Sequence, residues 1–153
     1  MFTEEEQPLL TGSDEEIEAF VDADRCMVSD WRSSEDDILF DIARFLPEGA
    51  FSYEVLSGVG EPTEVRVSFR GSEHSMPLSE QPYQNFRVLL WAIELLQPEY
   101  DARLFRCTED SDTPCFLLRP AAWWNAYRTA YLDKYQKIFR EPTDLIELFE
   151  MDN

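Results

Sequence analysis

Apolar residues change their spacing along the chain at residue 50, and this change limits the possible folds more than any other feature. Up to that point they recur at helical spacing over 38–46. Beyond it, apolar and polar residues alternate over 51–55 and again over 65–69, on either side of a turn at 58–62. Such alternation is typical of an antiparallel hairpin with one dry face and one solvated face. The chain must therefore combine helices with an antiparallel sheet.

Proline, glycine and capping residues divide the rest of the chain into further elements. Ser13 and Glu16 have the spacing of a capping box, which predicts that a helix begins there. Residues 86–96 form the most apolar helical pattern, which we expect in the centre of the core. The predicted elements are helices opened by Ser13, by Ser33 or Ser34 and by Ser79, hairpins over 51–69 and 100–119, a long helix from Pro120 to Pro142, and a last short segment capped by Thr143.

These elements predict an α+β fold with an antiparallel sheet of about four strands. The sheet is expected to consist of two β-hairpin–helix units, with helices covering one of its faces and two helices preceding it. We expect residues 1–12 to be a flexible acidic lead, because Pro8 and Gly12 interrupt regular structure. Residues 13–153 then form a single α+β domain, since a chain of this length buries enough surface to fold without a disulfide or a metal.

No motif in the sequence assigns a chemical activity. His74, the only histidine, is expected to face solvent beside a turn, and neither a nucleophile elbow nor a phosphate-binding glycine motif occurs. The carboxylates of 109–112 lack the glycine and the distal glutamate of a calcium loop. Cys26, Cys107 and Cys115 lack zinc spacing, so we expect reduced thiols, and Cys107 and Cys115 could face each other across a turn. We accordingly expect a protein that is not an enzyme and has no cofactor and no metal.

The net charge of −19 is concentrated at the two ends of the chain. Residues 1–41 carry 14 Asp and Glu but only two Arg, residues 42–140 are close to neutral, and residues 141–153 carry five acids and no base. This asymmetry favours a basic partner and argues against binding to nucleic acid or to an anionic membrane. The longest apolar run, 88–93, is too short for a membrane span, and the acidic N-terminus differs from a signal peptide. We therefore expect a soluble, cytoplasmic protein.

The acidic runs supply the candidate partner-binding residues. Carboxylates packed within a Debye length of about 8 Å repel one another, and a basic partner would relieve that repulsion. A tryptophan among the acids suits an interface anchor. The candidates are Asp14, Glu15 and Glu18 in the first predicted helix, Trp31, Glu35, Asp36 and Asp37 around the start of the second, and Glu109, Asp110 and Asp112 on the turn of the second hairpin.

The segment from Phe86 to Tyr127 resembles a helix–hairpin–helix pattern found in small bacterial proteins. It contains RVLLWAIELLQPEYDARLFR, then SDT, then FLLRPAAWWNAY, and it covers about a quarter of the chain. In this pattern, and in its small size and acidity, the chain resembles the immunity proteins that bacteria make against their own secreted or contact-delivered toxins. The resemblance implies a cytoplasmic protein that neutralises a cognate toxin, often a basic nuclease, by covering its active site. It assigns no role to any single residue.

Three other functions fit the same composition. One is an acidic nucleic-acid mimic that inhibits a restriction or CRISPR-type effector. Such a mimic should space its acids along elongated helices at roughly one charge per 1.7 Å of duplex, whereas here they cluster at the chain ends. The others are a small enzyme or ligand-binding domain and an adaptor in a larger assembly. The sequence leaves the partner's identity and the choice between monomer and dimer open.

Overall fold

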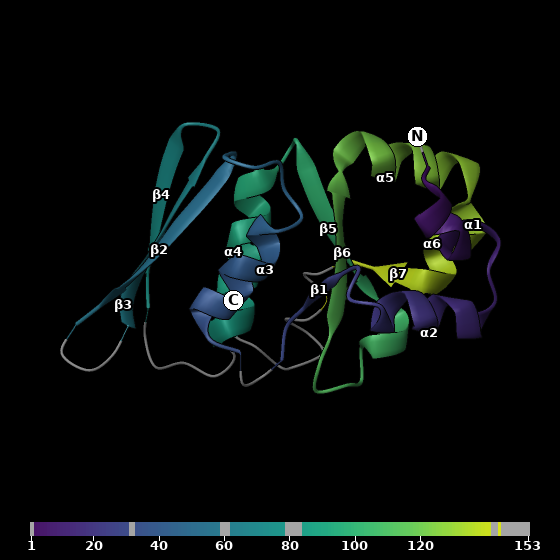
Figure 1. The fold of residues 1–153 in the computed structure, drawn as a ribbon, viewed down its shortest axis with the longest axis horizontal. Coiled ribbons are helices and arrows are strands. Elements are labelled where there is room, and N and C mark those ends of the chain that lie inside the picture. The colour runs from purple at the N-terminus through teal and green to yellow at the C-terminus, as the bar shows by residue number, and fades with distance from the viewer. Residues whose placement is uncertain (1, 31–32, 59–61, 79–83, 142–143, 145–153) are drawn as a thin grey trace.

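The computed structural model describes residues 2–30, 33–58, 62–78, 84–141 and 144, and it has the predicted α+β fold with antiparallel sheets. Helices and strands alternate in blocks along the chain (Figure 1). The elements are the 3-10 helix η1 (Glu4–Glu6), α1 (Gln7–Thr11), α2 (Asp14–Asp22), β1 (Met27–Val28), α3 (Glu35–Ala43), β2 (Phe51–Ser57), β3 (Pro62–Phe69), β4 (Ser72–Pro77), α4 (Gln84–Leu96), β5 (Tyr100–Phe105), the 3-10 helix η2 (Arg106–Thr108), β6 (Cys115–Pro120), α5 (Ala121–Ala130), α6 (Leu132–Ile138) and β7 (Phe139–Arg140).

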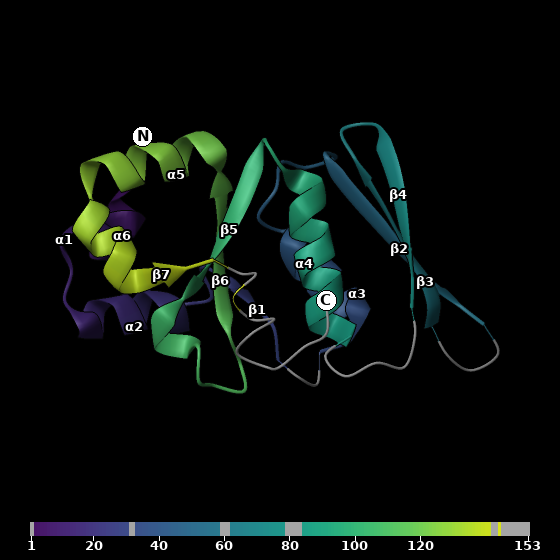
Figure 2. The ribbon, with the colours of Figure 1, turned by 180° about the vertical axis from the view of Figure 1, so that it is seen from behind.

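The strands form two antiparallel sheets, so the prediction of a single sheet was wrong. One sheet has the order β1-β6-β5-β7 and the other has the order β2-β3-β4. Figures 1 and 2 show α3 and α4 standing between the two sheets. Both helices contribute to one apolar core together with residues of β3, β5 and β6. Because this helix pair is apolar on two sides, each hairpin covers one side of it, and the hairpins do not pair edge to edge.

Helices cover both faces of the four-stranded sheet, and not one face as predicted. Ala102 and Leu104 of β5 face the core that contains α3 and α4. Phe105 of β5 and Leu117 of β6 face a second core, which also contains residues of α1, α2, α5 and α6. Since apolar residues point to both faces of β5 and β6, the sheet requires a cover on each side.

The N-terminal segment is helical and packed onto the second core, which corrects the expectation of a loose lead. Leu9 is fully buried in this core. The Tyr127 hydroxyl donates a hydrogen bond of 2.6 Å to the carbonyl oxygen of Leu9. The Phe2 ring lies edge-on to Trp123, with 5.6 Å between centroids. Burial of these apolar side chains outweighs the acidity of the segment and its proline.

The long helix predicted from Pro120 is interrupted. It consists of α5 and α6, which are separated at Tyr131 (φ −135°, ψ 48°), and the chain then enters β7, which pairs with β5. Thr143 lies outside the described residues, as does the predicted cap Ser79. In the described ranges, no helix has the length and apolar character needed to cross a membrane.

Candidate functional site

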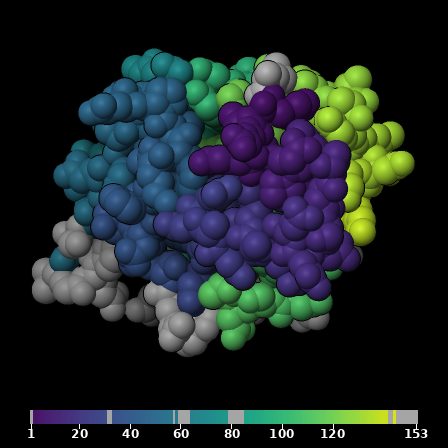
Figure 3. Space-filling model, turned by 45° about the vertical axis from the view of Figure 1, so that its right-hand side comes forward, coloured from purple at the N-terminus to yellow at the C-terminus, as the bar shows by residue number. Residues whose placement is uncertain are grey.

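The acidic N-terminal part of the chain runs continuously across one face of the molecule. In Figure 3 the colours from purple to blue, which mark the residues up to about 50, form one uninterrupted surface. The helices α2 and α3 lie on this side, and the turn between β5 and β6 lies beside α2 in Figure 1. We call the surface formed by α2, β1 and α3 the acidic face. It therefore brings together two acidic runs that are separate in the sequence.

A local capping motif orients the carboxylates of α2. The Ser13 hydroxyl accepts a hydrogen bond from the Glu16 backbone N–H, and the Glu16 carboxylate accepts one from the Ser13 N–H. The helix then buries Ile17 and turns Glu15 and Glu18 to solvent. Neither of these two glutamates forms an ion pair with another described residue.

Asp14 and Glu18 also line a shallow pocket of about 310 Å³ between α2, η2 and α6. Lys137 contributes to this pocket and lies 3.2 Å from the Asp14 carboxylate, an ion pair exposed to solvent. Cys107 is in the same pocket, and burial together with the charges of Glu18 and of nearby groups raises the pKa of its thiol. A thiol that stays protonated beside carboxylates is a poor nucleophile, so this pocket does not favour catalysis by Cys107.

A second capping motif places the acids of α3. The Ser34 hydroxyl accepts a hydrogen bond of 3.1 Å from the Asp37 N–H, and the Asp37 carboxylate accepts one of 3.2 Å from the Ser34 N–H. Asp36 and Asp37 are exposed, whereas Glu35 is half-buried. Burial raises the pKa of Tyr53 on β2, and so do the charges of Asp36 and Asp37.

The remaining predicted partner-binding residues are placed differently. Glu109 forms an ion pair of 2.7 Å with Arg140, so its carboxylate links the turn to β7. Asp110 and Asp112 are exposed on that turn. Trp31 lies outside the described residues. Among the described residues, no group of three or more His, Cys, Asp or Glu is arranged to hold a metal ion.

The sequence reasoning missed an exposed aromatic side chain on the acidic face. Phe40 of α3 is 62% exposed. Its neighbour Asp41 accepts a hydrogen bond of 2.7 Å from the backbone N–H of Val28, which is itself 36% exposed. The sequence could have indicated this exposure, because Phe40 lies outside the apolar stripe of the helix, which buries Ile38 and Ile42.

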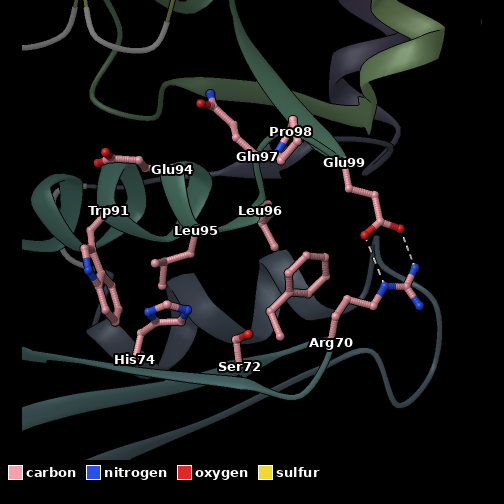
Figure 4. Close-up of a pocket in the computed structure, with 11 residues that line it drawn as sticks. Arg70, Ser72, His74, Trp91, Glu94, Leu95, Leu96, Gln97, Pro98 and Glu99 are labelled. Atoms are coloured by element: carbon pink, nitrogen blue, oxygen red, sulfur yellow. Dashed lines mark hydrogen bonds and ion pairs between the residues drawn. The ribbon is translucent and has the colours of Figure 1, made fainter.

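A groove of about 640 Å³ lies on a different part of the molecule, between β4 and α4. Figure 4 shows His74 of β4 facing Trp91 and Leu95 of α4 across it. At one end, Arg70 donates hydrogen bonds of 2.6 and 3.2 Å to the Glu99 carboxylate. Among the described residues, no hydrogen bond joins His74 to a hydroxyl or a thiol, so none of them is held against His74 as a nucleophile.

The tight turn from β3 to β4 sets the position of Arg70 at that groove. Arg70 (φ 52°) and Gly71 (φ 86°) both have left-handed backbone conformations. A two-residue hairpin loop of this kind needs positive φ at both positions, which glycine adopts easily and arginine adopts at a cost. The turn thus holds the guanidinium against Glu99 of the segment between α4 and β5.

The two buried cysteines, Cys26 and Cys115, lie together, whereas Cys107 is exposed. The pairing of β1 with β6, with Val28 opposite Cys115, brings the two buried thiols together. The thiols donate hydrogen bonds to the carbonyl oxygens of Val21 and Thr113, and their influence on each other raises the pKa of Cys26 and lowers that of Cys115. All three cysteines are free thiols.

No protein-family model, curated protein or solved structure matches the chain. The chemistry of the acidic face is therefore the guide to its function. That chemistry is a surface of exposed carboxylates with an aromatic side chain among them.

Proposed function

We propose that the protein is a non-catalytic binding protein that neutralises a basic protein partner, a cognate bacterial toxin domain, in the cytoplasm. Its acidic face would cover the partner's active site. The observation that carries the proposal is that residues 2–30 and 33–41, which hold 14 acids, lie together on the face of the molecule seen in Figure 3. Charge of one sign concentrated on one face attracts a partner of the opposite sign and speeds its association.

The carboxylates of this face are available to a partner. Glu15, Glu18 and Asp36 are exposed, and none of them forms an ion pair with another described residue. Arg44, a cation next to α3, is already held by Asp24 and Asp41. Carboxylates that repel one another in the free protein gain most when lysine or arginine side chains approach, because the repulsion is removed at the same time.

A toxin that cleaves nucleic acid has a basic active site, since it must bind a phosphate backbone. A surface of closely spaced carboxylates imitates that charge and competes for the same basic side chains. An acidic mimic of nucleic acid that inhibits a restriction or CRISPR-type effector would use the same chemistry, so the identity of the partner distinguishes the two functions.

The experiment is a pull-down of the tagged full chain from its native cell lysate at low salt, elution with high salt, and mass spectrometry of the eluate. We expect one basic, stoichiometric partner. A toxin domain supports the proposal, whereas a restriction or CRISPR-type effector would instead support the mimic. Absence of any partner at low salt would contradict the proposal.

Charge reversal tests which surface makes the contact. Asp36→Lys with Asp37→Lys, or Glu15→Lys with Glu18→Lys, should weaken binding at least about tenfold at low salt and reduce its salt dependence. The matched control is Glu73→Lys with Asp133→Lys, which changes the net charge equally at exposed positions of β4 and α6. Calorimetric titration with the purified partner measures both effects. Equal weakening by the control pair would show that net charge matters and the acidic face does not.

A ligand-binding role is the second candidate, and the groove between β4 and α4 is the observation that favours it (Figure 4). His74→Ala and Trp91→Ala alter opposite walls of that groove. If the partner binds these two variants as it binds the unmodified protein, the groove takes no part in the proposed function.

A further inference from the structure

Exposed apolar side chains on this protein gather on the acidic face. The described part of the chain exposes three large apolar side chains, Val28, Phe40 and Leu132, and the first two belong to β1 and α3 of this face. Single exposed apolar residues are common and need no explanation. Val28 and Phe40 lie on different elements, however, and Asp41, which follows Phe40 in the chain, ties α3 to β1 by accepting the hydrogen bond from the Val28 N–H. We call Val28 and Phe40 the apolar spot.

Carboxylates lie beside Phe40 on α3. Asp36 and Asp37 lie one helical turn before Phe40, on the same side of α3, and Asp41 follows it. Arg44, one turn after Phe40, forms ion pairs with Asp24 and Asp41, so it neutralises Asp41 but not Asp36 or Asp37. Its guanidinium lies over the ring of Phe45, 4.4 Å from the centroid. An apolar centre with a charged rim is the arrangement found at the energetic centre of protein interfaces.

We propose that Phe40 is the anchor of the partner interface and inserts into an apolar pocket that is ringed by lysine or arginine side chains on the partner protein. This inference rests on the proposed function and names the chemistry of the surface that the acidic face recognises. Val28 would cover the edge of the same pocket. Burial of an aromatic ring supplies binding energy that surface carboxylates alone do not, since exposed ion pairs contribute little.

The negative charge beside Phe40 favours a basic protein as the binding partner over a second copy of the chain, a membrane or a nucleic acid. A second copy of the chain would bring two rings of carboxylates together, because each copy carries the same acids around Phe40. An anionic membrane surface or a nucleic acid would meet the same repulsion. A basic protein surface is the occupant that gains from both the ring and the carboxylates.

The anchor and its rim should affect different rate constants. Rim charges act mainly on association, whereas a buried anchor acts mainly on dissociation. We expect Phe40→Ala to raise the dissociation rate on the order of 30-fold without changing the salt dependence of association. The charge reversal of Asp36 and Asp37 should instead slow association and reduce its salt dependence.

The test uses the full chain and the partner recovered at low salt, with surface plasmon resonance at several salt concentrations. Leu132→Ala is the matched control, because Leu132 on α6 is 51% exposed and lies outside the acidic face. Both side chains are exposed, so both alanine variants should unfold within about 2 °C of the unmodified protein. Phe40→Trp keeps an aromatic anchor and should bind more tightly than Phe40→Ala.

A photo-crosslinking amino acid at position 40, compared with the same group at position 132, provides an independent measurement. Crosslinking to the partner from position 40 and not from 132, with faster dissociation of Phe40→Ala, supports the proposal. Salt-dependent binding with Phe40→Ala indistinguishable from Leu132→Ala would overturn the anchor and leave the proposed function standing. If no basic partner is recovered, both fail.

Discussion

At the scale of single residues, Glu6 ties the N-terminal segment to the second core. Its side chain is 3% exposed. It accepts hydrogen bonds of 2.7 Å from the Arg119 guanidinium, 3.2 Å from the Trp123 indole and 2.8 Å from the Thr3 N–H. Burial by itself would raise the pKa of Glu6, but these bonds and the charge of Arg119 outweigh it and lower the pKa below the usual 4.5.

We expect Glu6→Gln to lower the free energy of unfolding by about 2 kcal/mol at pH 7, because Gln loses the charged hydrogen bonds to Arg119. A carboxyl whose pKa is depressed in the folded state stabilises the protein above its unfolded pKa and stops doing so as the pH falls through the folded value. The difference between variant and unmodified protein should therefore shrink below about pH 4.5. Urea unfolding at pH 7 and in acid measures this, with Glu5→Gln, an exposed neighbour, as the control. If the difference in the free energy of unfolding between the two proteins stays constant with pH, the pKa of Glu6 is not lowered in the folded state.

At the scale of elements, α1 illustrates how a weak local pattern can still be part of a core. Five residues with a proline in the first turn are too short to be stable as an isolated helix. Packing of Leu9 and Leu10 against the second core supplies the stability that the local sequence does not.

We expect Leu9→Ala to destabilise the protein by about 3 kcal/mol, because it removes a fully buried side chain and leaves a cavity. Leu132→Ala, at an exposed position, should change the free energy of unfolding by less than about 0.5 kcal/mol. Thermal or urea unfolding compares the two. Equal effects would mean that residues 2–12 behave as the loose lead expected from the sequence.

At the scale of the whole molecule, the net charge of −19 makes the stability of the folded protein depend on the salt concentration. Repulsion among the acids destabilises the compact state, and added salt screens it. Raising the sodium chloride concentration from about 20 mM to 0.5 M should raise the unfolding midpoint by about 2–4 °C, or roughly 1 kcal/mol for a chain of this size.

A variant that combines Glu15→Lys, Glu18→Lys, Asp36→Lys and Asp37→Lys is the matched comparison for this salt effect. It removes repulsion from the acidic face, so its midpoint should rise less with salt than that of the unmodified protein. Differential scanning calorimetry measures both midpoints. An equal rise would place the repulsion elsewhere on the molecule.

Local chemistry by itself determined the fold class and where several elements begin. The caps Ser13 and Ser34 act on backbone N–H groups within three residues, and side-chain alternation over 51–55 and 65–69 is a property of neighbouring residues. The position of most candidate acids on exposed helix faces follows from the same periodicity.

Only the tertiary structure decided how the elements meet. The two hairpins lie in separate sheets because α3 and α4 are apolar on two sides, and the chain turns at Tyr131, where no proline or glycine stands, so that β7 can pair with β5. The pairing of Cys26 with Cys115 and the apolar spot of Val28 and Phe40 likewise join residues from different elements. Such contacts depend on burial and pairing between distant segments, which no short stretch of sequence encodes.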